Sequence, residues 1–258
     1  MKKNFYLQAC MASNVGLVRR KNEDNYIFHG KYNEKSEQNM EDKKQVCLTE
    51  PILYGVFDGM GGEAYGEEAS CLMAKVCQKY QLHIGHLQED ARALCMIGNE
   101  LVVREEELRG LSMGSTASML IFDEKVLACN VGDSPIYLYR NGDLRAIYEE
   151  QTEKKLYEQM GLTDVLNNKK KYRLIQHIGF QGEGIQILPY LEEIEVKDQD
   201  IFLICSDGLT DMADEESIKK VLSSFDEESA MRLVNLALEN GGHDNVTAIL
   251  IRVGEINV

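Results

Sequence analysis

The chain has 258 residues, 44% of them hydrophobic, and a formal net charge of −15 at pH 7. This charge repels polyanions, so we expect neither nucleic acid nor an anionic membrane among its partners. No stretch offers the roughly 18 unbroken apolar residues of a membrane helix, and the start lacks the apolar core of a signal peptide. The seven cysteines are an odd number and lie mostly among apolar residues, which is typical of a reducing compartment. We therefore expect a cytoplasmic monomer with one domain spanning residues 1–258.

The first half of the chain predicts strands, a loop and two helices. Alternating apolar residues indicate strands at 5–12, 24–28 and 51–57, and the polar stretch 30–45 predicts a long loop. Apolar residues at helical spacing predict helices over 67–80 and 87–108. Both helices have one apolar face, so each should pack on a sheet.

The second half begins with short apolar runs joined by tight turns, among them Asn141-Gly142, a strong type I′ signal. A polar segment at about 150–184, with a short helix near 155–160, predicts a mobile flap. Asp214 and Asp226 are expected to be the N-caps of two later helices. The predicted strands of this half are 116–122, 125–131, 136–139, 144–148, 184–188, 192–196, 201–205 and 245–253.

The order of these elements indicates the fold class. Strands come in runs, helices come in pairs, and short turns favour antiparallel neighbours, so the fold is α+β rather than alternating βαβ. We expect a four-layer α-β-β-α sandwich, in which two antiparallel sheets are flanked by pairs of antiparallel helices.

Acidic residues recur where a predicted strand ends or a glycine-rich turn begins. A carboxylate at a strand end is held on a rigid scaffold, and an adjacent glycine lets the backbone turn and expose its carbonyl oxygen. Several such carboxylates would repel one another without a cation, and an all-oxygen set suits Mg²⁺ or Mn²⁺. Each Asp-Gly alone could be an ordinary turn. The segments are Val56-Phe57-Asp58-Gly59, Asn130-Val131-Gly132-Asp133, Cys205-Ser206-Asp207-Gly208, Gly241-Gly242-His243-Asp244 and Glu23-Asp24.

These segments and two others stand in an order that resembles the PP2C-type (PPM) protein phosphatases, in particular their bacterial branch. The resemblance runs nearly end to end. It is carried by Gly16 to Asp24, the Asp58 segment to Gly62, Gly114-Ser115-Thr116-Ala117, Asn130 to Ser134, Ser206 to Asp211, and Gly241 to Thr247.

The resemblance implies a site with two Mn²⁺ or Mg²⁺ ions. Asp58 would bridge both ions, and the carbonyl oxygen of Gly59 would bind one of them. Asp207 and Asp244 would complete the coordination of the second ion, and Asp133 occupies the position of a ligand to a third, more weakly bound metal.

Other residues would act around the ions. Glu23 and Asp24 match an acidic pair that contacts the metals through water, and Arg19 matches the arginine that holds the substrate phosphate. Two cations that share a water lower its pKa, so a hydroxide would attack phosphorus in line without a phosphoenzyme intermediate. The implied substrates are phosphoserine and phosphothreonine in proteins, and the implied partners are a Ser/Thr kinase and its targets.

Three positions depart from the family pattern. Glu63 stands where bacterial relatives usually have histidine, and Pro135 replaces a common arginine. Glu149-Glu150-Gln151-Thr152 also lacks the Asp-His-Ser/Thr pattern. The predicted metal ligands are intact, whereas the rate, the affinity for a third metal and the choice of substrate stay open.

Other functions fit the sequence less well. None of the seven cysteines is followed by arginine six positions later, as a cysteine-dependent phosphatase requires, and no calcium-binding D-x-[DN]-x-[DN]-G loop occurs. The alternative that stays open is a metal-poor pseudophosphatase that binds phosphopeptides. Two secondary hypotheses concern His243, as an acid or base, and the basic run Lys169-Lys170-Lys171-Tyr172-Arg173, which could steer anionic peptides.

Overall fold

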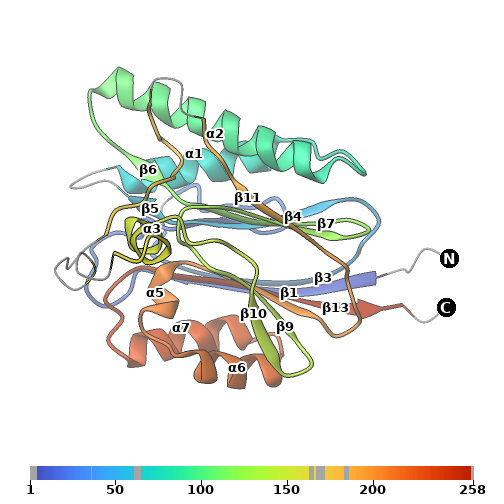
Figure 1. Cartoon of the computed structure of the whole chain (residues 1–258). Coiled ribbons are helices and arrows are strands. Elements are labelled where there is room, and N and C mark those ends of the chain that lie inside the picture. Colours follow the sequence, from blue (N-terminus) through green and yellow to red (C-terminus); the bar gives the residue numbers. More distant parts are fainter. Residues whose placement is uncertain are drawn as a thin grey trace.

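The computed structural model describes residues 5–35, 37–60, 65–162, 166, 172–182 and 186–256. Two antiparallel sheets lie face to face at the centre of the molecule (Figure 1). The larger sheet has the strand order β10-β9-β12-β13-β1-β3, and the smaller one has the order β11-β8-β7-β4-β2. A short pair, β5 and β6, forms a third sheet.

The chain contributes strands to the two large sheets from both of its halves. The larger sheet consists of β1 (Phe5–Asn14), β3 (Asn39–Cys47), β9 (Ile136–Arg140), β10 (Asp143–Ala146), β12 (Ile201–Cys205) and β13 (Val246–Glu255). The smaller sheet consists of β2 (Asn25–Ile27), β4 (Ile52–Phe57), β7 (Ala117–Phe122), β8 (Val126–Val131) and β11 (Tyr190–Ile194). The short pair consists of β5 (Gly59–Met60) and β6 (Gly114–Ser115).

Helices cover the outer faces of both sheets, so the four-layer α-β-β-α prediction is confirmed (Figure 1). On the smaller sheet lie α1 (Gly66–Lys79) and α2 (Leu87–Arg109). On the larger sheet lie α5 (Asp207–Thr210), α6 (Glu215–Ser223) and α7 (Ser229–Glu239), while α3 (Glu153–Gln159) lies near one end of the sandwich.

Apolar side chains fill the three interlayer spaces. Between the two sheets, the ring of Phe122 contacts those of Tyr54 and Phe202 edge to face, with centroid distances of 5.7 and 5.3 Å. Met73 and Leu94 pack under the first helical layer, and Leu233 packs under the second. Burying each such side chain contributes roughly 1.5–3 kcal/mol, so the three layers of contacts hold the strand ends firmly.

The predicted loop at 30–45 is wrong for its second half, because β3 begins at Asn39. This strand lies at the edge of the larger sheet, and β1 is its one partner among the described residues, from Tyr6↔Cys47 to Asn14↔Asn39. Its outer residues are charged and exposed, as is common for an edge strand, so it lacks the apolar alternation that marks a strand.

Two further predictions are corrected in the second half. Residues 186–188 form no strand, because β11 begins only at Tyr190; residues 184 and 185 lie outside the described part. Asp214 is confirmed as an N-cap, since its carboxylate accepts a hydrogen bond from the Ser217 amide. Asp226 is not the N-cap: the N-cap of α7 is Glu228, and the Asp226 carboxylate, two residues earlier, accepts hydrogen bonds from the Glu228 amide at 2.8 Å and from Arg232 at 2.7 Å. No helix in the described ranges is long and apolar enough to cross a membrane.

Candidate active site

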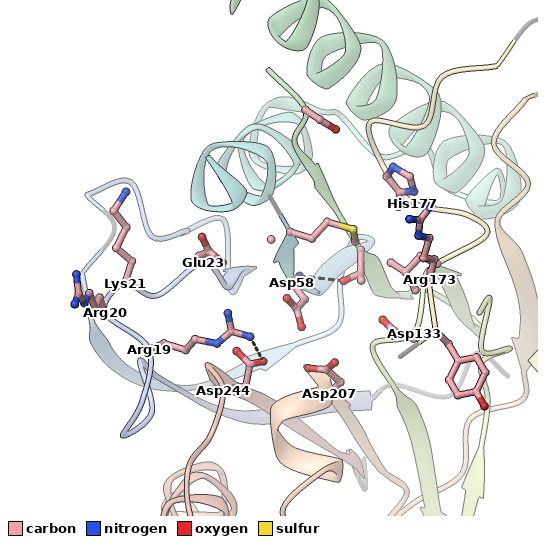
Figure 2. A pocket seen from close by; sticks show the side chains of 16 residues that line it. Arg19, Arg20, Lys21, Glu23, Asp58, Asp133, Arg173, His177, Asp207 and Asp244 are labelled. Carbon is pink, nitrogen blue, oxygen red and sulfur yellow. Dashed lines mark hydrogen bonds and ion pairs between the residues drawn. The ribbon is translucent and has the colours of Figure 1, made fainter. Parts of the chain in front are cut away.

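The predicted acidic residues lie at one end of the sandwich because of how the strands run. In an antiparallel sheet alternate strands share a direction, so β4 and β8 end at the same edge and place Asp58 and Asp133 there. In the other sheet Asp207 follows β12, and Asp244 precedes its neighbour β13. The four carboxylates converge on one cavity of about 920 Å³ (Figure 2).

Asp58 and Gly59 are fixed by backbone hydrogen bonds. The Asp58 amide donates to Thr116 Oγ1 at 3.0 Å, and the Thr116 amide donates back to the Asp58 carbonyl at 2.9 Å. A Cβ on Gly59 would lie 2.2 Å from the carbonyl oxygen of Gly66 and 2.5 Å from that of Glu23. Only glycine therefore fits between α1 and the segment that carries Glu23.

Asp24 is buried beneath the cavity. Its Oδ2 accepts hydrogen bonds from the hydroxyls of Ser206 and Thr247, each at 2.7 Å. Its Oδ1 has no hydrogen-bond partner within the described ranges. Burial raises the pKa of Asp24 to about 7, although the two hydroxyl donors act in the opposite direction. The unpaired oxygen is suited to a water or a cation above it.

Burial and mutual repulsion raise the pKa values of these carboxyl groups. The pKa of Asp58 is raised well above its usual range, first by burial and then by the charges of Asp24, Asp207 and Asp133. Burial, together with Asp207, raises the pKa of Asp133 to about 7. Burial raises the pKa of Asp207 to about 6, while a hydrogen bond with Asp58 lowers it. The cluster therefore concentrates more negative charge than its surroundings compensate at neutral pH.

The segment that carries Arg19 is attached to the same site by Asn245. The Asn245 side chain donates to the carbonyl oxygens of Val15 and Lys21, each at 2.9 Å, and its Oδ1 accepts from the Glu23 amide at 2.8 Å. Gly16 has a φ of +79°, and a Cβ there would lie 2.2 Å from the Asp244 carbonyl oxygen. The Asn245 hydrogen bonds and the close approach at Gly16 thus hold this loop against the turn that precedes β13.

Arg19 points into the cavity and pairs with a predicted metal ligand. Its Nη2 donates to Asp244 Oδ2 at 2.5 Å (Figure 2). That hydrogen bond is the main cause of the raised pKa of Arg19. Both side chains are partly exposed, so the pair is of the kind that exchanges partners at little cost.

The donor set fits hard divalent cations. It consists of carboxylate and carbonyl oxygens, and it carries an excess of negative charge at the base of an open cavity. In the described residues no three His, Cys, Asp or Glu side chains are already arranged around a single point as a metal site. A cation that keeps several of its waters needs only two or three protein oxygens. The arrangement therefore suits a partly hydrated Mg²⁺ or Mn²⁺ ion better than an ion that is coordinated by protein atoms alone.

The structure brings most of the predicted site residues together. Asp58, Gly59, Asp133, Asp207, Asp244, Glu23 and Arg19 all line the cavity, and Asp24 lies buried beneath it. His243 is exposed and does not line it. Glu63 and the lysines 169–171 lie outside the described residues.

Two groups of residues at the site were not among the predicted site residues. Ser206, Thr247 and Asn245 belong to the recognised motifs, and for Ser206 and Asn245 the acidic neighbours Asp207 and Asp244 are a sequence signal of a supporting role. Arg173 and His177 line the cavity from the predicted flap. Arg173 ends the basic run 169–173, for which steering of anionic peptides was predicted, but no local pattern places either residue in the cavity, because both reach it only through the path of the chain.

Comparisons with known proteins agree with this geometry. The family model described as protein phosphatase 2C matches residues 29–239. The serine/threonine protein phosphatase PstP of Mycobacterium tuberculosis is 30% identical over 96% of this chain, which spans only 45% of PstP. The serine/threonine phosphatase stp of Listeria monocytogenes is 28% identical over 92% of both chains.

A solved structure shares the whole fold. The catalytic domain of PstP in complex with two manganese ions is 29% identical, with a TM-score of 0.77, and the match covers 97% of this chain and 99% of that domain. Because the family model spans well over half of the sequence and the site residues meet as the motifs predict, the chain belongs to the protein phosphatase 2C family.

Proposed function

We propose that the chain hydrolyses phosphoserine and phosphothreonine in proteins, with two divalent cations and without a phosphoenzyme intermediate. The observation that carries this proposal is the convergence of Asp58, Asp133, Asp207 and Asp244 on one cavity beside Arg19. Family membership and the names of the relatives support it. Its partners would be phosphoproteins, among them a Ser/Thr kinase and that kinase's targets.

In this proposal the whole chain forms one phosphatase domain, and residues at about 150–184 form a flap along the cavity. Asp58, the Gly59 carbonyl, Asp207 and Asp244 would hold two Mn²⁺ or Mg²⁺ ions. Glu23 and Asp24 would act through water, and Asp133 would belong to a third, weaker site. When bound, the cations supply Lewis acidity that lowers the pKa of a water and neutralises charge on the phosphoryl oxygens.

The protein's own groups position the reactants. Thr116 fixes the backbone at Asp58, and the hydroxyls of Ser206 and Thr247 hold the carboxylate of Asp24 in place. Arg19 would exchange Asp244 for the substrate phosphate, because its planar guanidinium can donate two parallel hydrogen bonds to phosphate oxygens.

The thiols are poorly suited to nucleophilic catalysis. Cys205, the cysteine nearest to Asp207 in sequence, is fully buried, and burial raises the pKa of its thiol well above the usual value. Burial also raises the pKa of Cys10 to about 11. Because the thiolate is the reactive form, these groups would be unreactive at neutral pH.

Turnover of a phosphoserine peptide with and without Mn²⁺ tests the proposal. We expect release of inorganic phosphate only with the metal, and incorporation of one oxygen from ¹⁸O-labelled water into that phosphate in a single turnover. Binding of the peptide without metal-dependent turnover would favour the pseudophosphatase alternative. A labelled phosphoenzyme trapped by acid quenching would overturn the direct attack of water.

A further inference from the structure

The side of the cavity that lies across from Arg19 is formed by the chain segment 172–182. Arg173 and His177 stand there together (Figure 2). The backbone of this segment is attached to its surroundings: the Glu153 amide donates to the Arg173 carbonyl at 2.9 Å, and Ile178 and Ser115 exchange two hydrogen bonds at 2.8 and 2.9 Å. This wall is therefore held in place along its length.

Arg173 contributes a positive charge to this wall, and its side chain forms no ion pair with the described residues. Its side chain is exposed and makes no ion pair, hydrogen bond or ring contact within the described ranges, although its amide donates to Glu153 Oε2 at 3.1 Å. By contrast, Arg140 pairs with Asp200 and Arg232 with Asp226, each at 2.7 Å. In a chain with a net charge of −15, an unpaired guanidinium beside the reactive centre is available to an anion from outside.

His177 adds a polar group to the same wall. Its ring packs edge to face on Phe180, with 5.5 Å between the centroids, and its Nδ1 is buried without a hydrogen-bond partner in the described part of the chain. Burial lowers the pKa of His177, which leaves the ring uncharged at neutral pH. A neutral imidazole can donate one hydrogen bond and accept another.

The cavity is larger than the reaction needs. Its volume of about 920 Å³ lies near the upper end of the roughly 300–1,000 Å³ that holds a whole drug-sized ligand, so a phosphoserine side chain fills only part of it. Arg19 stands on one side of the carboxylates and Arg173 on the other (Figure 2). A substrate segment can therefore place one anionic group near Arg19 and a second one near Arg173.

We propose that Arg173, assisted by His177, forms a subsite for a second anionic group of the substrate, a phosphate or carboxylate that lies near the phosphoserine undergoing hydrolysis. This inference rests on the proposed phosphatase function and names the substrate class: doubly phosphorylated or acidic segments. Phosphate should be preferred to carboxylate, because it offers more charge and more acceptor oxygens to the guanidinium fork.

The test compares peptides that differ in one flanking residue. Peptides with one central phosphoserine carry alanine, glutamate or a second phosphoserine at each position from three before to three after it. Initial rates with Mn²⁺ give kcat/KM for the wild type, for Arg173→Gln and for a control, Arg104→Gln. Arg104 is exposed on α2 and does not line the cavity.

We expect the wild type and Arg104→Gln to favour the doubly phosphorylated peptide over the alanine peptide by about three- to tenfold at one or two positions, as a partly exposed charge-assisted contact allows. Glutamate should give a smaller preference at the same positions. Arg173→Gln should reduce both ratios to about one, because its loss of kcat/KM should be much larger on the doubly phosphorylated and glutamate peptides than on the alanine peptide and an aryl phosphate. His177→Gln should reduce the ratios in part.

Two results would overturn the subsite: equal rates for all peptides in the wild type, or an equal loss on every peptide in Arg173→Gln. Titration calorimetry with peptides in which both phosphoserines are phosphonate analogues measures the same selectivity without turnover. Selective binding that depends on Arg173, without hydrolysis of any peptide, would refute the phosphatase proposal but keep the subsite. Hydrolysis of all peptides without selectivity would keep the phosphatase proposal and refute the subsite.

Discussion

The cavity has two unlike parts, a floor of carboxylates and a wall formed by residues 172–182. The floor residues follow or precede strands of two stacked sheets, are buried or half-buried, and repel one another. Hydrogen bonds from Thr116, Ser206 and Thr247 hold Asp58 and Asp24 among them. The wall comes from a polar segment, and its charged group, Arg173, is exposed and unpaired among the described residues. The contrast suggests that the floor determines the chemistry and the wall determines which substrates reach it.

The change with the largest expected effect is Asp207→Asn in the floor. The amide cannot supply the charge that the cations need, and loss of several kcal/mol of transition-state stabilisation corresponds to a fall of about 10³-fold or more in kcat/KM. Because this substitution also removes a repelling charge from beside Asp58, the variant in EDTA should melt at a higher temperature than the wild type.

Steady-state kinetics with Mn²⁺ and thermal melting in EDTA check both expectations for Asp207→Asn. Asp143→Asn, an exposed change in β10 away from the cavity, is the matched control. It should alter neither kcat/KM with Mn²⁺ nor the melting temperature in EDTA. Turnover near the wild-type value with Mn²⁺ would remove Asp207 from the metal site. A lower melting temperature in EDTA would show that its role is structural.

The second prediction concerns pH and uses the raised pKa values of the floor. Asp24 and Asp133 have pKa values of about 7 in the folded protein against an ordinary value of 3.8. The folded state therefore binds these protons more tightly than the unfolded state. Their contribution to stability is fully present below about pH 4 and is lost as the pH rises through 7.

This loss can be isolated with Asp133→Asn. In EDTA, the melting temperature of the variant relative to the wild type should be higher at pH 8 than at pH 5, because only the wild type must ionise a buried carboxyl group. Mn²⁺ should stabilise the wild type more at pH 8 than at pH 5, since metal and protons compete for the same oxygens. A difference that does not change with pH would contradict the raised pKa of Asp133.

The same contrast explains what could be predicted from the sequence. Asp58, Asp133 and Asp207 follow a local rule, a carboxylate beside a glycine at a strand end, and Asp244 belongs to a glycine-rich turn before a strand. The topology of the sheets then brings the four together. Strand β3 could not be predicted, because an edge strand whose outer face meets solvent has no apolar alternation. Arg173 and His177 belong to a segment without periodicity, and their place depends on hydrogen bonds to Glu153 and Ser115 that lie far away in sequence.

Arg19 lies on the side of the floor that faces away from the wall (Figure 2), and Arg19→Ala should have an intermediate effect. Loss of a charge-assisted contact to phosphate should raise KM by about ten- to a hundredfold and change kcat less. The structure adds a second effect: without its partner, Asp244 becomes free for a cation. Metal affinity should then rise, by no more than about fivefold, because the pair is partly exposed.

Kinetics at saturating Mn²⁺ and calorimetric metal titration separate the two effects of Arg19→Ala. Arg20→Ala is the control, because Arg20 lines the same cavity but makes no ion pair with the described residues. An unchanged KM would show that Arg19 does not hold the phosphate. A weaker affinity for metal would show that the ion pair supports the site instead of competing for it.

The smallest expected effect belongs to lysines 169–171, which precede the wall in sequence. Three positive charges in a chain with a net charge of −15 should raise the local concentration of anionic peptides without touching the reacting group. Replacing all three with glutamine should lower kcat/KM by about two- to fivefold at low salt. At about 0.5 M salt the Debye length is only a few ångströms, so the kcat/KM values of the wild type and the variant should converge.

Arg173→Gln should behave differently, because a direct contact keeps part of its selectivity in salt, whereas steering does not. If the lysine variant instead kept its deficit at high salt, these residues would contact the substrate, and the anionic subsite would extend along the flap beyond Arg173.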